Sequence, residues 1–211
     1  MITKECLQVP RTPASLARFV KTRVRIIKAA PVQLAKARLR NGPYKVFREE
    51  IIPLSQFCPH RFPSDDVRVR PVIGTQAYDA EVFDFAGRRR AVIELVSPID
   101  GPLEKKIASA MNDKGRFIYD CSSQQEEIEA FIRAIERLKQ AAKKKALRDY
   151  RVRDGAAILV IAMNHPPPHD TLRSVCGMHW AAFVTWLATV PFQCDEVYVL
   201  MSWVGTVIRI K

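Results

Sequence analysis

Apolar residues recur at helical spacing through the first part of the chain. Residues 13–40 have this period, and Pro31 must interrupt it, so we expect two helices. The sequence Asn41-Gly42-Pro43 is a helix stop signal. We expect a shorter helix over residues 44–54. Residues 55–66 contain two prolines and a polar end, which is typical of a loop.

The centre of the chain changes to the pattern of β-strands. Residues 66–74 alternate charged and apolar side chains, and two further strand-like segments follow at 78–85 and 90–97. The sequence AGRRR, residues 86–90, is a plausible turn between the last two. We therefore expect three antiparallel strands in a meander.

The second half of the chain alternates between helical and strand patterns. A continuous apolar run at 156–163 is typical of a strand covered on both faces. Residues 178–189 predict an apolar, mostly buried helix. With a short helix at 103–113 and two closing strands at 195–202 and 206–210, the order predicts an α/β fold with a central mixed sheet flanked by helices.

Residues 122–149 are the strongest predicted helix. Ser122 and Ser123 offer N-caps, and Glu126 completes a capping box with Ser123. The acids of this helix lie early and its bases lie late, as the helix macrodipole favours. This structural interpretation explains the basic residues at its end without a nucleic-acid contact: Lys143, Lys144, Lys145 and Arg148.

The net charge of +12 is concentrated in the N-terminal region. Residues 1–48 contain 12 lysines or arginines and one acid, whereas residues 49–211 contain 22 basic and 21 acidic residues. Such a segment suits a polyanion, so we expect nucleic acid, in the first instance DNA, as a partner. A solvated helix face and an organellar transit peptide are the alternatives. We divide the chain into a basic helical segment, 1–43, and an α/β domain, 44–211. Phosphate contacts are expected at Arg18, Lys21, Arg23, Arg25, Lys28, Lys36, Arg38 and Arg40.

Other features narrow the class of protein. The sequence contains no apolar run of about 18 residues, the length that a transmembrane helix needs, so no membrane partner is expected. Five scattered cysteines without a CxxC pair favour free thiols and a cytoplasmic location. No phosphate-binding loop, dinucleotide fingerprint or nucleophile elbow occurs. Cys176 and His179 lie three residues apart and leave a thiol enzyme as an alternative, although a core cysteine and a surface histidine explain both residues.

Two acids in the predicted meander are the main chemical feature. Glu94 stands inside the apolar run AVIELVSP, where an ionised carboxylate is costly unless it is paired or bound to metal. Alternation places it on the face of Val92 and Val96, and pairing across the turn brings it near Asp79 or Glu81. A divalent cation would relieve the repulsion between the acids and would activate water for attack on a phosphodiester.

The pattern resembles that of the PD-(D/E)XK, or restriction-endonuclease-like, nuclease superfamily. That pattern is an Asp at a strand start, a spacer, and then apolar-Glu-apolar-Lys on the next strand. Here Asp79 is followed by 14 residues and then by Glu94-Leu95-Val96, so a valine replaces the lysine, and Tyr78 replaces the usual proline before the Asp.

The resemblance covers about residues 44–165. It implies a core of helix, three-strand meander, helix and strand, to which this chain would add a C-terminal helix and hairpin. It also implies an Mg²⁺- or Mn²⁺-dependent endonuclease, with the metal held by Asp79, Glu94 and the Leu95 carbonyl.

A second resemblance concerns the missing lysine. One large bacterial branch of this superfamily carries a strand reading Glu-Val-Leu-Ser-Pro, followed by a helix with a lysine in a Leu-x-x-Lys context. In this chain, residues 94–98 read ELVSP and residues 103–107 read LEKKI. The resemblance implies that the catalytic lysine is Lys106, with Lys105 as the next match, and that the accessory acid is Glu50 or Glu49.

Two further alternatives remain open. Glu94 would be a structural acid if it paired with Arg68, Arg70 or Arg90 on neighbouring strands. Because Val96 replaces the lysine, the chain would also suit a catalytically inactive module of the same fold that binds nucleic acid or a protein partner. A homodimer is compatible with either function.

Overall fold

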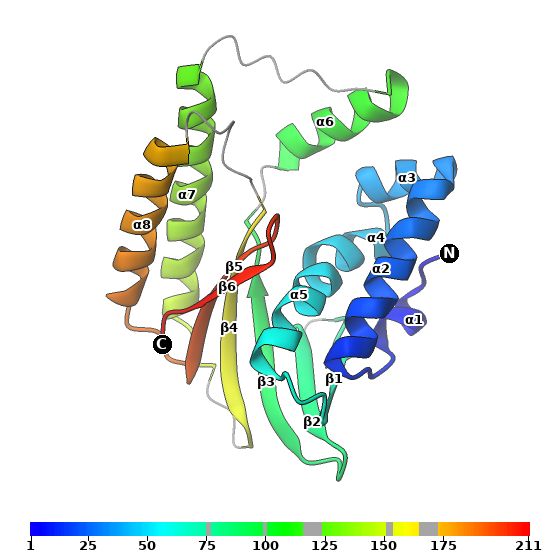
Figure 1. The fold of residues 1–211 in the computed structure, drawn as a ribbon, viewed down its shortest axis with the longest axis vertical. Coiled ribbons are helices and arrows are strands. Elements are labelled where there is room, and N and C mark those ends of the chain that lie inside the picture. Colours follow the sequence, from blue (N-terminus) through cyan, green and yellow to red (C-terminus); the bar gives the residue numbers. More distant parts are fainter. Residues whose placement is uncertain (75–76, 99–100, 116–123, 151–153, 165–172) are drawn as a thin grey trace.

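The computed structural model describes residues 1–211 except 75–76, 99–100, 116–123, 151–153 and 165–172 (Figure 1). Its centre is a six-stranded sheet in which the strands lie in chain order. The strands are β1 Val67–Pro71, β2 Ala80–Asp84, β3 Arg89–Val96, β4 Ala156–Met163, β5 Glu196–Met201 and β6 Thr206–Arg209.

The sheet is mixed, as the sequence predicts. Strands β1, β2 and β3 form the expected antiparallel meander, β3, β4 and β5 run parallel, and β6 returns antiparallel to β5. The parallel connections pass through helices: α6 Gly101–Asp113 and α7 Gln124–Ala146 between β3 and β4, and α8 Arg173–Ala188 between β4 and β5. The α/β class with a sheet flanked by helices is therefore confirmed.

Helices cover both faces of the sheet (Figure 1). Alternate residues of β3 divide between two hydrophobic cores, as the period of two requires. Ile93 and Leu95 belong to the core beneath the N-terminal helices. Val92 and Val96 belong to the core beneath α7 and α8. Glu94, between Val92 and Val96 on the same face, is thus placed at the second core.

The N-terminal helices are α1 Lys4–Gln8, α2 Pro13–Ala29 and α3 Pro31–Arg38. The predicted break at Pro31 is confirmed, and α1 is an additional short helix. Leu7 and Leu16 are fully buried in the same core as the meander. Arg11 also forms an isolated antiparallel bridge with Val69 of β1. Residues 1–43 therefore share a hydrophobic core with the sheet.

The predicted loop at residues 55–66 is wrong over most of its length. The chain is helical from α4 Pro43–Val46 through a π-helical turn, η1 Phe47–Ile51, to α5 Ile52–Arg61. Phe57 and Cys58 are fully buried, and this burial holds the helix together. Pro59 lies inside this helix and removes one backbone hydrogen bond, a cost that the burial of Phe57 and Cys58 outweighs.

The helices of the second half agree with the sequence with one correction. The helices predicted over 103–113 and 122–149 are α6 and α7, although Ser122 and Ser123 lie outside the described residues. The helix predicted over 178–189 is α8, but it is not mostly buried. Phe183 and Leu187 face the core, whereas Met178 is 66% exposed, because α8 is covered on one side only.

Gly155, just before β4, gives a test of this packing. It has φ +84°, and a Cβ there would lie 2.6 Å from the Arg90 carbonyl carbon and oxygen on the neighbouring strand. We expect Gly155→Ala to lower the free energy of unfolding by about 3 kcal/mol, because strain and a backbone clash add. Gly87 also has a positive φ but open space around it. Gly87→Ala should cost about 1 kcal/mol. Urea denaturation measures both, and equal losses would contradict the close approach of β3 to Gly155.

Candidate functional site

Asp79 is fixed against the backbone of β3. It lies immediately before β2, and its N–H donates to the Ile93 carbonyl at 2.8 Å. Its Oδ2 accepts a hydrogen bond from the Leu95 N–H at 2.7 Å. These two bonds flank Glu94, so the structure brings Asp79 and Glu94 together as the strand pairing predicts. Burial raises the pKa of Asp79, and the Leu95 N–H and Lys145 oppose the rise.

Glu94 lies in the middle of β3 and is only 8% exposed. Its Oε1 accepts a hydrogen bond in an ion pair from Lys145 in the last turn of α7. Burial raises the pKa of Glu94, the Lys145 hydrogen bond lowers it, and the charge of Asp79 raises it further. The charge of Asp79 therefore acts on Glu94, and the ammonium group of Lys145 offsets part of the repulsion.

The arginines that could have neutralised Glu94 are engaged elsewhere. Arg70 pairs with Glu81, Arg90 lies 3.9 Å from Asp84, and Arg68 lies over the Phe85 ring. The alternative in which one of these arginines pairs with Glu94 is therefore wrong.

Glu81 is not part of the carboxylate pair. It is paired with Arg70 and with Arg89 at 3.6 Å, and the Tyr78 hydroxyl donates to it. Because the side chain is fully engaged in these contacts, Asp79 and not Glu81 is the acidic neighbour of Glu94.

Glu50 is a third carboxyl group whose pKa is affected by Asp79 and Glu94. It lies in the π-helical turn η1, and such turns shift the direction of side chains and are common at functional sites. Its pKa is raised to about 8, first by burial and then by the charges of Asp79, Glu49 and Glu94, with Lys45 opposing the rise. Glu49 instead pairs with Arg40 at 3.0 Å. Of the two predicted accessory acids, Glu50 is thus the one coupled to Asp79 and Glu94.

The lysine at this site comes from α7 and not from α6. Lys106 and Lys105 are exposed on α6, and no ion pair or hydrogen bond among the described residues involves either. Lys145 occupies the place predicted for Lys106. Val96, at the usual lysine position, is buried in the core under α7.

The sequence did carry a signal for Lys145. The buried stripe of α7 runs through Phe131, Ile135, Leu138 and Ala142, and Lys145 is the next position at the same spacing of four and three. A lysine on a buried stripe has to point toward the sheet. The macrodipole accounts equally for all the basic residues at 143–148, so it does not distinguish the partly buried Lys145 from the exposed Lys143 and Lys144.

Tyr150 is a further polar residue at the site that sequence reasoning missed. It is 9% exposed and, together with Tyr78, Val92 and Glu94, lines a cavity of about 130 Å³. Burial raises the pKa of its hydroxyl, and the charges of Lys145 and Glu94 act on it in opposite senses. The hydroxyl makes no hydrogen bond within the described part of the chain. A cavity of this size accommodates water that would satisfy it.

The donor set suits a hard divalent cation in part. Asp79 Oδ1 and Glu94 Oε2 accept no hydrogen bond from any described residue, so each carboxylate keeps one oxygen for a ligand. Oxygen donors of this kind are those that Mg²⁺ and Mn²⁺ prefer. Within the described residues, however, no three His, Cys, Asp or Glu side chains lie close enough together to form a metal site by themselves. A bound ion would thus need water or backbone oxygens, such as the Leu95 carbonyl.

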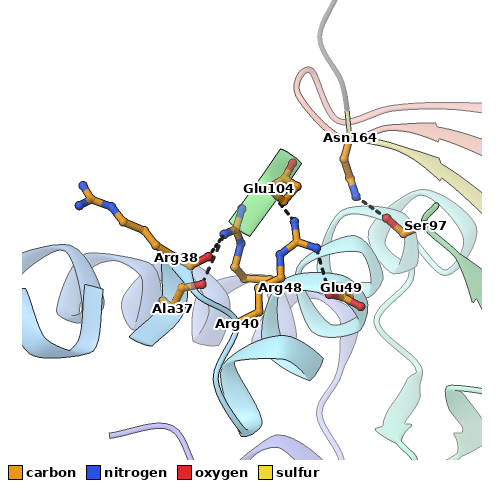
Figure 2. A network of polar contacts seen from close by, with 8 residues as sticks. All are labelled: Ala37, Arg38, Arg40, Arg48, Glu49, Ser97, Glu104 and Asn164. Carbon is orange, nitrogen blue, oxygen red and sulfur yellow. Dashed lines mark hydrogen bonds and ion pairs between the residues drawn. The ribbon is translucent and has the colours of Figure 1, made fainter. Parts of the chain in front are cut away.

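The predicted phosphate contacts differ in how far their side chains are engaged within the protein. Arg38 donates to the backbone at Met111 at 2.9 Å, and Arg40 bridges Glu49 and Glu104 at 3.0 Å each (Figure 2). These two arginines join α6 to α3 and η1. Arg23 is half-buried, 5.3 Å from the Phe19 ring centre. The exposed members are Arg18, Lys21, Arg25, Lys28 and Lys36.

The thiol alternative receives no support. Burial raises the pKa of Cys176, which disfavours a reactive thiolate, and His179 is exposed. The other described cysteines, Cys6, Cys58 and Cys194, are also free thiols. Cys121 lies outside the described residues.

Comparisons with family models, curated proteins and solved structures gave no match. Among the described residues, no helix has both the length and the hydrophobicity that a membrane crossing requires. The functional argument therefore rests on the residues and contacts above.

The raised pKa of Glu50 predicts a pH-dependent cost to stability. A carboxyl whose pKa rises on folding is favourable to the native state at low pH, and stability is lost as pH rises from the ordinary value of 4.5 through about 8. We expect Glu50→Gln to raise the free energy of unfolding by about 1–2 kcal/mol at pH 8, a figure reduced for partial solvation. The gain should vanish near pH 4.

Thermal melts between pH 4 and 9 without divalent cations measure this effect. Glu136→Gln, at an exposed position of α7, is the matched control and should change little at any pH. A pH-independent difference between Glu50→Gln and wild type would contradict the electrostatic origin of the cost.

Proposed function

We propose that this protein is a metal-dependent nuclease that hydrolyses phosphodiester bonds of nucleic acid, in the first instance DNA. The observation that carries the proposal is the buried Glu94–Lys145 ion pair beside Asp79. Asp79, Glu94 and Lys145 are the two acids and the lysine of the nuclease pattern. The lysine comes from α7, because β3 has Val96 where that pattern has lysine. The order α5, β1, β2, β3, α6, α7, β4, in which two helices connect β3 to β4, also supports a restriction-endonuclease-like core.

The residues would divide the work as follows. Asp79, Glu94 and the Leu95 carbonyl would hold Mg²⁺ or Mn²⁺, which supplies charge neutralisation and an acidified water when bound. The Lys145 ammonium would orient the attacking water and stabilise the charge that develops on the phosphoryl oxygens. Glu50, whose pKa lies near neutrality, is suited to exchange a proton with that water.

The exposed basic residues of α2 and α3 would hold the nucleic-acid backbone. Lys21, Arg25 and Lys28 are exposed on α2, and their side chains have no acidic partner among the described residues. Contacts of this kind fix position without reading sequence, and their strength falls steeply as salt rises.

One observation favours a second candidate, a catalytically inactive binding module on the same fold. Lys145 already neutralises Glu94 without any metal ion. In that case the ion pair would be structural, and nucleic-acid or protein binding would not depend on divalent cations. Cleavage assays separate the two candidates.

The test is Mg²⁺- or Mn²⁺-dependent cleavage of plasmid, single-stranded DNA and RNA by wild type and four variants. We expect Glu94→Ala and Lys145→Ala to lower the rate by about 100-fold or more, because each removes a charge from the transition state. Lys145→Arg keeps the ion pair and should still lose most activity. Lys106→Ala, at the lysine first predicted, should cleave like wild type.

Thermal melts establish that each variant is folded. A Lys145→Ala variant that is folded and fully active would contradict the assigned role of this lysine, and equal cleavage by Glu94→Ala would contradict the nuclease itself. A wild type that binds nucleic acid but cleaves none of the substrates would favour the binding module.

A further inference from the structure

Arg48 is a cation whose environment is only partly explained by the fold. It lies in η1, two residues before Glu50, and is half-buried. Its Nη1 donates to the carbonyl oxygens of Ala37 and Arg38 at 3.4 and 3.5 Å, which are long and weak bonds. No carboxylate lies within ion-pair distance of it among the described residues. A half-buried guanidinium thus keeps Nε and Nη2 available for an acceptor.

The nearby Arg40 takes the carboxylates that could otherwise pair with Arg48. Figure 2 shows the side chains of Arg40 and Arg48 close together between α3, η1 and α6. Two acids of this junction, Glu49 and Glu104, pair with Arg40. The pKa of Arg48 is lowered first by burial and then by the positive charge of Arg40, with Glu104 and Glu49 opposing this effect. A bound anion would relieve both burial and repulsion.

Arg40 itself has little left to offer a ligand. Both of its Nη atoms are used by carboxylates, and its Nε is enclosed without a partner. Arg38 donates to Met111 and Asn112 at the end of α6, and in Figure 2 its side chain extends away from Arg48. Both residues therefore join helices. Arg38, like Arg48, uses only its Nη1 in these bonds, but it is bonded to the end of α6, whereas Arg48 lies on the same turn as Glu50.

The surroundings favour a polyanion over a carboxylate ligand. Residues 31–51 and 101–114, which form this junction, contain eight basic and four acidic residues. Arg48 is also on the same π-helical turn as Glu50, which is coupled to Asp79 and Glu94. Guanidinium forks recognise phosphate oxygens with two parallel hydrogen bonds, a geometry that Nε and Nη2 provide.

We propose that Arg48 is a binding residue for a phosphate of the nucleic-acid backbone. The inference rests on the proposed nucleic-acid function, but it does not require catalysis. It adds Arg48 to the phosphate contacts expected from the sequence, and it assigns two roles to the π-helical turn, since Glu50 is electrostatically coupled to the carboxylates while Arg48 binds the strand.

The experiment is fluorescence anisotropy of labelled duplex and single-stranded DNA in EDTA, over a series of salt concentrations. We expect Arg48→Ala to weaken binding several-fold at low salt and to reduce the slope of log K against log salt by about 0.7–0.9, the loss of one phosphate contact. Arg48→Lys should restore the slope and recover affinity only in part, because it lacks the fork. Arg133→Ala, an equal charge change on exposed α7, should behave like wild type.

The outcomes separate this proposal from the proposed function. If wild type binds and Arg48→Ala keeps the wild-type slope while folded, Arg48 is not a phosphate ligand, and the nuclease proposal is unaffected. If wild type binds no nucleic acid at any salt concentration, both proposals are overturned. An equal loss of slope in Arg133→Ala would show a general charge effect and would also overturn the assignment to Arg48.

Discussion

The ammonium group of Lys145 is what allows an acid to stand inside the central sheet. Glu94 is buried on β3 and lies next to Asp79, so without a cation both burial and like-charge repulsion would oppose ionisation. Lys145 reaches it from the end of α7, beyond the buried stripe that anchors that helix. The packing of α7 on the sheet therefore determines the charge balance of the site, because it places Lys145 against Glu94.

The other charged residues of the site come from the strand next to β3 and from the N-terminal helices. Asp79 is held by the backbone of β3 on both sides of Glu94. The turn η1 carries Glu50, whose pKa is raised by burial and by the charge of Asp79, and it places Arg48 beside Arg40. Arg40 in turn connects η1 to α6 through Glu49 and Glu104 (Figure 2). Helices from both halves of the chain thus contribute charged groups that act on Asp79 and Glu94.

The sequence predicted what depends on local period and failed where tertiary contacts decide. The six strands, the break at Pro31 and the approach of Asp79 to Glu94 follow from alternation and turn residues. The loop expected over residues 55–66 is helical because burial of Phe57 and Cys58 outweighs the effect of Pro59. The motif points to Lys106 or Lys105 because it is local in sequence, whereas a contact between residues 94 and 145 is visible only in space. Glu50 and Tyr150 likewise acquire their properties from neighbours remote in the chain.

The central claim is that Asp79 and Glu94 form a cation site that Lys145 completes. A crystal structure of the protein soaked in Mn²⁺ tests it most directly, because anomalous scattering locates the ion without reference to activity. The account predicts an anomalous peak between the two carboxylates, at about 2.0–2.3 Å from their oxygens, with Lys145 displaced toward a metal-bound water. A structure at saturating Mn²⁺ with no peak there, and with the Glu94–Lys145 ion pair intact, would contradict it.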